Sequence, residues 1–137
     1  MVLVDTSVWL NLFRKRDTPS TRYFQRLLEH QIPYGITGVI LQEILQGARS
    51  QADYMQLHEY LTTQRFYHPK EVVDSYAKAA ALYRECRGQG FTIRSSVDCL
   101  IAQIAIEHRL VLLHDDRDFL QLAKVSAQLT LVEPLDV

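Results

Sequence analysis

The chain has 137 residues, which is close to the commonest size of a single domain. Hydrophobic residues make up 47% and charged residues 23%, as in an ordinary globular protein, so a disordered, collagen-like or low-complexity chain is excluded. The net charge of −1 excludes a bulk-charge argument for nucleic-acid binding, because such proteins are often plainly basic. We therefore expect one domain over residues 1–137.

Neither a targeting signal nor a membrane span is expected. The N-terminus runs directly into an apolar segment, without a basic region or a long apolar run. No window reaches the roughly 18 apolar residues that a span needs. Cys86 and Cys99 have neither CxxC spacing nor a His at ligand spacing, which favours buried free thiols in a reducing compartment. A cytoplasmic protein is predicted.

The first half of the chain alternates strand-like apolar runs with helical patterns. Thr6 or Ser7 is expected to cap the first helix, Thr18-Pro19 opens the second, and Thr37 caps the third. In chain order we expect a strand at 2–4, helices at 8–13 and 18–31, a strand at 34–36, helices at 37–47 and 54–61, and a strand at 66–68.

The second half continues the alternation. The longest helix should end at Gly88 and Gly90, and Ser95 and Ser96 introduce the next one. In chain order we expect a helix at 70–87, a helix at 97–105, a strand at 110–113, a helix opened by residues 116–118 and running to 123, and a strand at 130–132. This order predicts an α/β fold with a parallel sheet covered on both faces.

Acidic residues follow several of the predicted strands or lie early in the helices after them. They are Asp5, Glu43, Asp98, Asp115, Asp116 and Asp118. Ligands in such folds bind beyond the carboxyl ends of the strands, where the strand order reverses, so these acids should gather at one edge of the sheet.

Each acid also has an ordinary explanation taken singly. Asp5 and Asp116 could cap helices, and Asp98 could be a first-turn acid favoured by the helix dipole. Capping does not explain Glu43, however, which lies on a helix that is apolar over most of its circumference. Buried unpaired carboxylates are costly, and a hard cation such as Mg²⁺ or Mn²⁺ would remove that cost.

Other common catalytic motifs are not found in the sequence. It contains no HExxH, GxSxG, GxGxxG or GxxxxGK[ST] pattern, which argues against a zinc helix, a serine nucleophile elbow and nucleotide cofactors. His114, the histidine nearest the acids, is expected to support the site or the fold rather than ligate a metal.

Four short motifs around these acids occur in order along the chain. They are Val-Leu-Val-Asp5-Thr6-Ser7-Val-Trp, Thr37-Gly-Val-Ile-Leu-Gln-Glu43-Ile-Leu-Gln-Gly47, Asp98-Cys-Leu-Ile-Ala102 and Leu-Leu-His114-Asp-Asp116-Arg-Asp118-Phe119. Together they resemble PIN-domain ribonucleases, and the VapC-type toxins of bacterial toxin–antitoxin pairs in particular. The resemblance covers nearly the whole chain and implies a PIN-like three-layer α/β/α fold with a central, mostly parallel sheet.

The resemblance implies a metal-dependent endoribonuclease. The matching catalytic set is Asp5, Glu43, Asp98 and Asp116, of which Asp5, Asp98 and Asp116 are expected to hold Mg²⁺ or Mn²⁺. Asp118, Ser7 and Thr6 are implied accessories that make hydrogen bonds within the site. In the same loop, Asp115 is expected to be a solvated acid, and Asp118 to bind backbone N–H groups and steady the turn.

The resemblance also implies macromolecular partners. These are an RNA substrate and a cognate antitoxin whose tail covers a groove and directs a basic side chain toward the acids. A homodimer is expected as well, because the stretch from Trp9 to Phe13 and the helix at 39–45 offer more apolar surface than a small core needs.

The distribution of charge is compatible with RNA. Removing five of the 16 acidic residues, Asp5, Glu43, Asp98, Asp116 and Asp118, leaves 11 acidic residues against 15 basic ones. Arg14, Arg16, Arg94 and Arg117 are the candidate phosphate contacts, although each could equally be a solvated surface arginine.

Two other functions stay open at the level of the sequence. A metal-dependent phosphatase or phosphotransferase would need a second acid two residues after its nucleophile, where this chain has Ser7. A non-catalytic PIN-like interaction module would have no need of the intact set of four acids.

Overall fold

In the computed structural model, which describes residues 1–133, five strands form one all-parallel sheet in the order β3-β2-β1-β4-β5. The strands are β1 (Val2–Val4), β2 (Tyr34–Thr37), β3 (Arg65–Tyr67), β4 (Val111–Leu113) and β5 (Thr130–Leu131). The predicted strands are therefore confirmed, with β3 one residue earlier than expected. The predicted domain runs to residue 137, and its last four residues, 134–137, lie outside the described residues.

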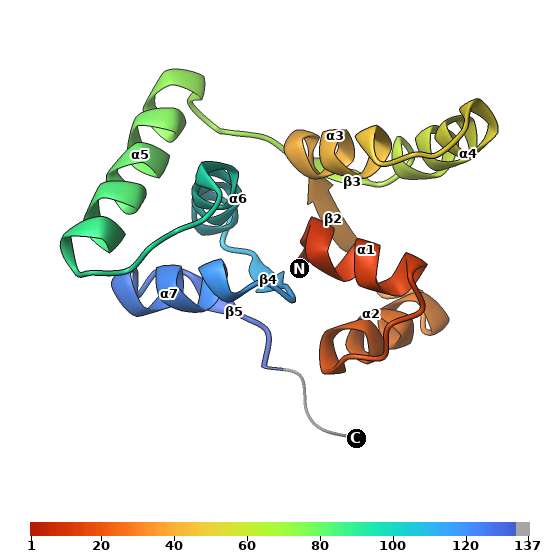
Figure 1. Cartoon of the computed structure of the whole chain (residues 1–137), viewed down its shortest axis with the longest axis horizontal. Coiled ribbons are helices and arrows are strands. Elements are labelled where there is room, and N and C mark those ends of the chain that lie inside the picture. The colour runs from red at the N-terminus through yellow and green to blue at the C-terminus, as the bar shows by residue number, and fades with distance from the viewer. Residues whose placement is uncertain (134–137) are drawn as a thin grey trace.

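Seven helices of the described chain cover the two faces of the sheet. They are α1 (Thr6–Phe13), α2 (Pro19–Glu29), α3 (Gly38–Gln46), α4 (Gln51–Leu61), α5 (Val72–Gly88), α6 (Ser96–Glu107) and α7 (Arg117–Val125). Helices α1 to α4 lie on one face of the sheet and α5 to α7 on the other, as Figure 1 shows. The predicted three-layer architecture is confirmed.

Three helix starts differ from the prediction for local reasons. Helix α4 begins at Gln51 rather than residue 54, because the Ser50 side chain caps it by accepting from the Asp53 N–H. Asp5, rather than Thr6 or Ser7, caps α1, because the chain is still extended at Asp5 and its side chain accepts from the Ser7 N–H. Helix α5 begins at Val72 rather than residue 70, and Glu71 at its N-cap makes no side-chain capping bond. Its predicted end is confirmed: α5 stops at Gly88, and Gly90 adopts a φ of 85° that favours glycine.

The core surrounds the central strands. Leu3, Val4, Leu112 and Leu113 are fully buried, as expected for apolar strands covered on both faces. Trp9 packs edge-on against Phe24 with ring centroids 4.8 Å apart. The expectation that Trp9 adds free surface is therefore wrong, because it belongs to the core, whereas Phe13 at the end of the same helix is 46% exposed.

Three further sequence predictions bear on the fold. Cys86 and Cys99 are buried and free, as predicted. Among the described helices none is long and apolar enough to cross a membrane. Thr37 caps α3 through its side chain, as predicted.

Strand β1 marks the point at which the strand order reverses. It lies between β2 and β4, so the chain runs outward in one direction through β2 and β3 and then returns to the other side of β1. Val4 pairs with Leu113, and the Asp5 N–H donates to the Leu113 carbonyl at 2.9 Å. The residues that follow β1 and β4 therefore lie side by side, at the edge where ligands bind in parallel sheets.

Candidate metal-dependent active site

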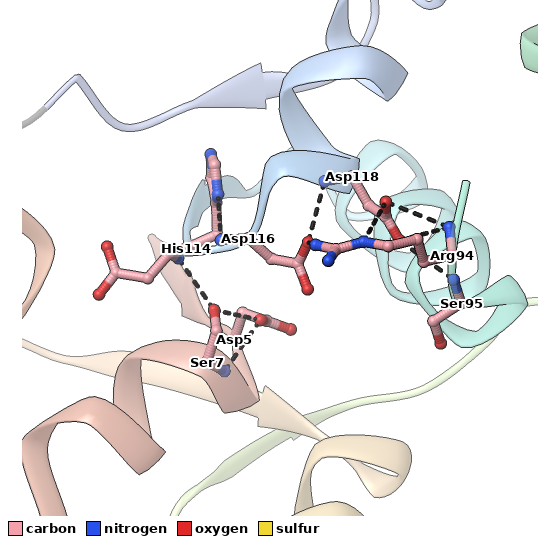
Figure 2. A network of polar contacts seen from close by, with 8 residues as sticks. Asp5, Ser7, Arg94, Ser95, His114, Asp116 and Asp118 are labelled. Carbon is pink, nitrogen blue, oxygen red and sulfur yellow. Dashed lines mark hydrogen bonds and ion pairs between the residues drawn. The ribbon is translucent and has the colours of Figure 1, made fainter. Parts of the chain in front are cut away.

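Asp5 leaves β1 and caps α1 with one oxygen only. Its Oδ2 accepts hydrogen bonds from the Ser7 backbone N–H at 3.0 Å and the Ser7 hydroxyl at 2.6 Å (Figure 2). Its Oδ1 is buried and accepts no hydrogen bond from the described residues. Burial raises the pKa of Asp5 to about 6 despite the Ser7 bonds, and the nearby Glu43 and Asp116 charges act in the same direction.

Glu43 lies on α3 and is hydrogen-bonded to Thr6. The Thr6 hydroxyl donates to Glu43 Oε1 at 2.7 Å, which joins the first turn of α1 to α3. Glu43 is half-buried and lines a groove between α1, α3 and α4. The sequence prediction that this acid faces a ligand site rather than the core is thus consistent with its position at the rim.

The loop after β4 carries Asp116 as the N-cap of α7. Asp116 Oδ1 accepts from the Asp118 N–H at 2.9 Å, and the Asp116 N–H donates to His114 Nδ1 at 3.1 Å. A backbone N–H can only donate, so His114 Nδ1 is the acceptor in this bond, and burial, which lowers the pKa of His114, favours the neutral imidazole. His114 therefore supports the loop, as the sequence predicts.

Asp118 connects this loop to the segment before α6. Its side chain is almost fully buried, and its carboxylate accepts from the backbone N–H groups of Arg94, at 3.0 Å, and of Ser95, at 3.1 Å. The expectation that Asp118 binds backbone N–H groups is confirmed, but those groups belong to a segment 24 residues away rather than to its own turn. It ties α6 to α7 at the edge of the sheet.

Asp98 enters the site from the first turn of α6. It is 6% exposed, and within the described residues its Oδ2 is buried without a hydrogen-bond partner. Burial raises the pKa of Asp98 to about 9, and the neighbouring Asp118, Asp5 and Asp116 carboxyl groups raise it further. A carboxylate in these surroundings is stable only when a positive group balances its charge.

Three of the acids form a cluster that could hold a cation. One carboxylate oxygen from each of Asp98, Asp116 and Asp118 lies within 4.8 Å of the others. Asp5 acts on Asp98 through its charge but is not one of this trio. The unpartnered oxygens of Asp5 and Asp98 and the hard oxygen donors fit a divalent ion such as Mg²⁺ or Mn²⁺. Asp118 thus joins the candidate ligands beyond the predicted Asp5, Asp98 and Asp116.

Asp115 is not the solvated acid that the sequence suggested. Its Oδ2 accepts from Asn11 Nδ2 at 2.9 Å and from the Thr18 hydroxyl at 2.8 Å, and its N–H donates to Ser7 Oγ at 2.9 Å. These bonds connect the β4–α7 loop to α1 and the start of α2. The prediction failed because Asn11 and Thr18 are about a hundred residues from Asp115 in sequence. The only sequence feature that bears on these contacts is that Thr18 is expected at the start of a helix.

The four candidate arginines lie in different places. Arg94 approaches the acids, with Nη2 3.4 Å from Asp116 Oδ1. Arg14 and Glu43 line the same groove. Arg16 and Arg117 are exposed. The structure therefore places Arg94 next to the acidic cluster and Arg14 in the groove that Glu43 also lines.

Comparison with known proteins agrees with this geometry. The model of the PIN domain family matches residues 2–125. VapC ribonuclease Mb1587 from Mycobacterium bovis and ribonuclease VapC11 from Mycobacterium tuberculosis are each 33% identical to the chain over 127 residues, which cover 92% of this chain and 94% of each relative.

Solved structures share the fold. A toxin–antitoxin complex from Klebsiella pneumoniae superimposes with a TM-score of 0.68 at 21% identity, covering 100% of both chains. VapBC2 from Rickettsia felis, bound to a DNA fragment from its promoter, gives 0.68 at 19% identity, covering 96% of this chain and 98% of that one. With a family match over most of its length and VapC ribonucleases among its relatives, the chain belongs to the PIN-domain family, in its VapC-type group.

Proposed function

We propose that this protein is a metal-dependent endoribonuclease that serves as the toxin of a toxin–antitoxin pair. The observation that carries the proposal is a pair of buried carboxylate oxygens, on Asp5 and Asp98, without a hydrogen-bond donor among residues 1–133. Asp5 directly follows β1, and Asp98, on α6, lies with one oxygen within 4.8 Å of oxygens of Asp116 and Asp118, which follow the neighbouring strand β4. The names of the relatives, which are ribonucleases, support RNA as the substrate.

The ion would be held by Asp5, Asp98 and Asp116, with Asp118 beside them. When bound, Mg²⁺ or Mn²⁺ supplies positive charge for the phosphate and makes water a better nucleophile. Ser7 holds Asp5 in one orientation.

Glu43, whose Oε1 accepts a hydrogen bond from the Thr6 hydroxyl, would accept a proton from the attacking water. The water oxygen bonds to phosphorus, one P–O ester bond breaks, and the leaving ribose oxygen takes up a proton from solvent water. No protein nucleophile is required in this scheme.

The two alternative functions have weaker support. A phosphatase that uses Asp5 as its nucleophile would need a second acid where Ser7 stands, and Ser7 instead makes two hydrogen bonds to Asp5. A non-catalytic module would bear the cost of burying Asp98 among other acids without any use for it.

We also propose an antitoxin that occupies the groove between α1, α3 and α4. This groove has a volume of about 670 Å³, and its lining combines Leu10, Phe13 and Leu57 with Glu43 at the catalytic end. An amphipathic segment could bury its apolar side chains there while a basic side chain reaches the acids. A cytoplasmic homodimer is proposed as well, and the exposed Val73 and Tyr76 on α5 support a second contact surface.

The test of the proposed function is RNA cleavage by the purified protein. We expect cleavage with Mg²⁺ or Mn²⁺ that stops with EDTA and is lost in Asp5→Asn and Asp116→Asn. Asp74→Asn is a matched control, because Asp74 is an exposed acid on α5 that pairs with Lys78 at 3.0 Å. Full activity after exhaustive chelation, or equal activity in the site variants and the control, would refute the proposal.

A further inference from the structure

The structure anchors the backbone of Arg94 next to the acidic cluster. Arg94 lies in the segment between α5 and α6, and the Asp118 carboxylate accepts from its N–H and from that of Ser95. Asp118 is 2% exposed, and its own N–H donates to Asp116 Oδ1. The position of Arg94 is therefore fixed relative to Asp116 through a single buried residue.

The Arg94 side chain extends over the carboxylates on their solvent side. Its Nη2 lies 3.4 Å from Asp116 Oδ1 and its Nε 3.8 Å from Asp118 Oδ1, and Figure 2 shows the guanidinium beside both carboxylates. The side chain is nevertheless 64% exposed. A guanidinium has five N–H donors, so these long contacts leave much of its hydrogen-bonding capacity directed toward solvent.

An acidic site needs a positive group at its entrance if it is to receive a phosphodiester. Even with one divalent ion bound, the carboxylates of Asp5, Glu43, Asp98, Asp116 and Asp118 would otherwise repel the RNA backbone, because they outnumber the charges of the ion. Arginine suits this task because its planar fork matches two oxygens of one phosphate.

Resting on the proposed function, we propose that Arg94 is a catalytic residue that binds a non-bridging oxygen of the scissile phosphate. Asp116 would hold the divalent ion, whose charge would balance this carboxylate and so leave the Arg94 guanidinium free to turn to the phosphate. It then balances the negative charge that grows on the phosphate oxygens as water adds to phosphorus and the ester bond breaks. Arg94 forms no covalent bond and transfers no proton.

The simpler explanation is a surface ion pair that only offsets the acids. Exposed pairs of this kind contribute little to stability and would leave the cleavage rate unchanged once the metal is saturating. The two explanations therefore differ in the rate at saturating metal and RNA.

The experiment compares Arg94→Ala, Arg94→Lys and wild type in single-turnover cleavage at saturating enzyme and Mg²⁺. Arg65→Ala is the matched control, because Arg65 is exposed at the start of β3, at the opposite edge of the sheet. We expect Arg94→Ala to lower the cleavage rate about 100-fold or more and Arg94→Lys to lower it about tenfold, because lysine keeps the charge but loses the fork. Arg65→Ala should stay within about twofold of wild type.

Two further readouts separate this role from a structural one. RNA affinity, measured with Ca²⁺ in place of Mg²⁺, should weaken less than about tenfold in Arg94→Ala, because one phosphate contact among several is lost. The Mg²⁺-dependent rise in melting temperature should be retained or begin at lower Mg²⁺, because a competitor for Asp116 has been removed.

A wild-type rate in Arg94→Ala would overturn the inference. So would loss of the Mg²⁺ response in both Arg94 variants, since that result assigns Arg94 to building the site. Failure of the wild-type protein to cleave RNA with Mg²⁺ and with Mn²⁺ would instead overturn the proposed function.

Discussion

Replacing Asp98 by asparagine should stabilise the metal-free protein at neutral pH and abolish RNA cleavage. Burial among carboxylates raises the pKa of Asp98 to about 9 from an ordinary value of 3.8. A group whose pKa is raised by folding contributes stability below its unfolded pKa and loses that contribution as the pH rises through the folded value. Wild-type stability from Asp98 is therefore present near pH 4 and declines toward pH 9. Asparagine imitates the protonated form at every pH.

The size of the effect follows from the same pKa difference. Near pH 7 the unfolded chain has an ionised Asp98 while the folded chain holds it protonated, which sets a ceiling of about 4 kcal/mol on the gain. Relaxation of the site and entry of water reduce this, so a gain of about 2 kcal/mol is expected. Near pH 4.5 the gain should fall below about 1 kcal/mol. Asp5, whose pKa rises to about 6, is present in both proteins and largely cancels from the comparison.

The assay is urea denaturation of wild type and Asp98→Asn in EDTA at both pH values, repeated with Mg²⁺. Mg²⁺ should stabilise the wild type at neutral pH and affect Asp98→Asn much less, because the variant lacks a charged ligand. Asp74→Asn controls for the loss of an acid elsewhere. If Asp98→Asn were equally destabilising at both pH values in EDTA, the carboxyl group would be a favourable structural contact and the reasoning would be refuted.

Four further outcomes are expected. Mg²⁺ or Mn²⁺ should raise the melting temperature of the wild type, and a flat response in calorimetry would contradict a metal site. Asp116→Asn should lower the cleavage rate by about two orders of magnitude or more. Asp118→Asn should lower it less, because the amide oxygen can still accept from the backbone N–H groups of Arg94 and Ser95. Equal losses of rate in the two variants would contradict this difference. Asp115→Asn should change the cleavage rate and the melting temperature little, since one oxygen accepts both the Asn11 and the Thr18 hydrogen bonds. Asp115→Ala removes both bonds and should lower the melting temperature by several degrees. Identical melting temperatures of the two variants would contradict a stabilising role of these bonds. Expression of the wild-type chain without an antitoxin should arrest growth in a sensitive host, and harmless expression at high level would speak against toxicity.

The sequence alone was sufficient for the class of fold and for the acids that meet at the sheet edge. Short apolar runs such as Val2–Val4 predict buried strands, and Thr37 and Pro19 predict helix starts, because these preferences depend on neighbouring residues. Alternation of strands and helices then predicts parallel pairing, and parallel pairing brings the ends of β1 and β4 to one edge. The placement of Asp5 and Asp116 follows from that chain of reasoning.

The tertiary structure decided how each acid is held. Asp118 accepts from the Arg94 segment, Asp115 bonds to Asn11 and Thr18, and Trp9 belongs to the core rather than to a free surface. Each of these outcomes joins segments far apart in the chain, and periodicity and capping report only on residues within a turn or two. Such contacts depend on the distance and angle at which helices pack on the sheet, so only the folded structure could place the Arg94 guanidinium over the acids.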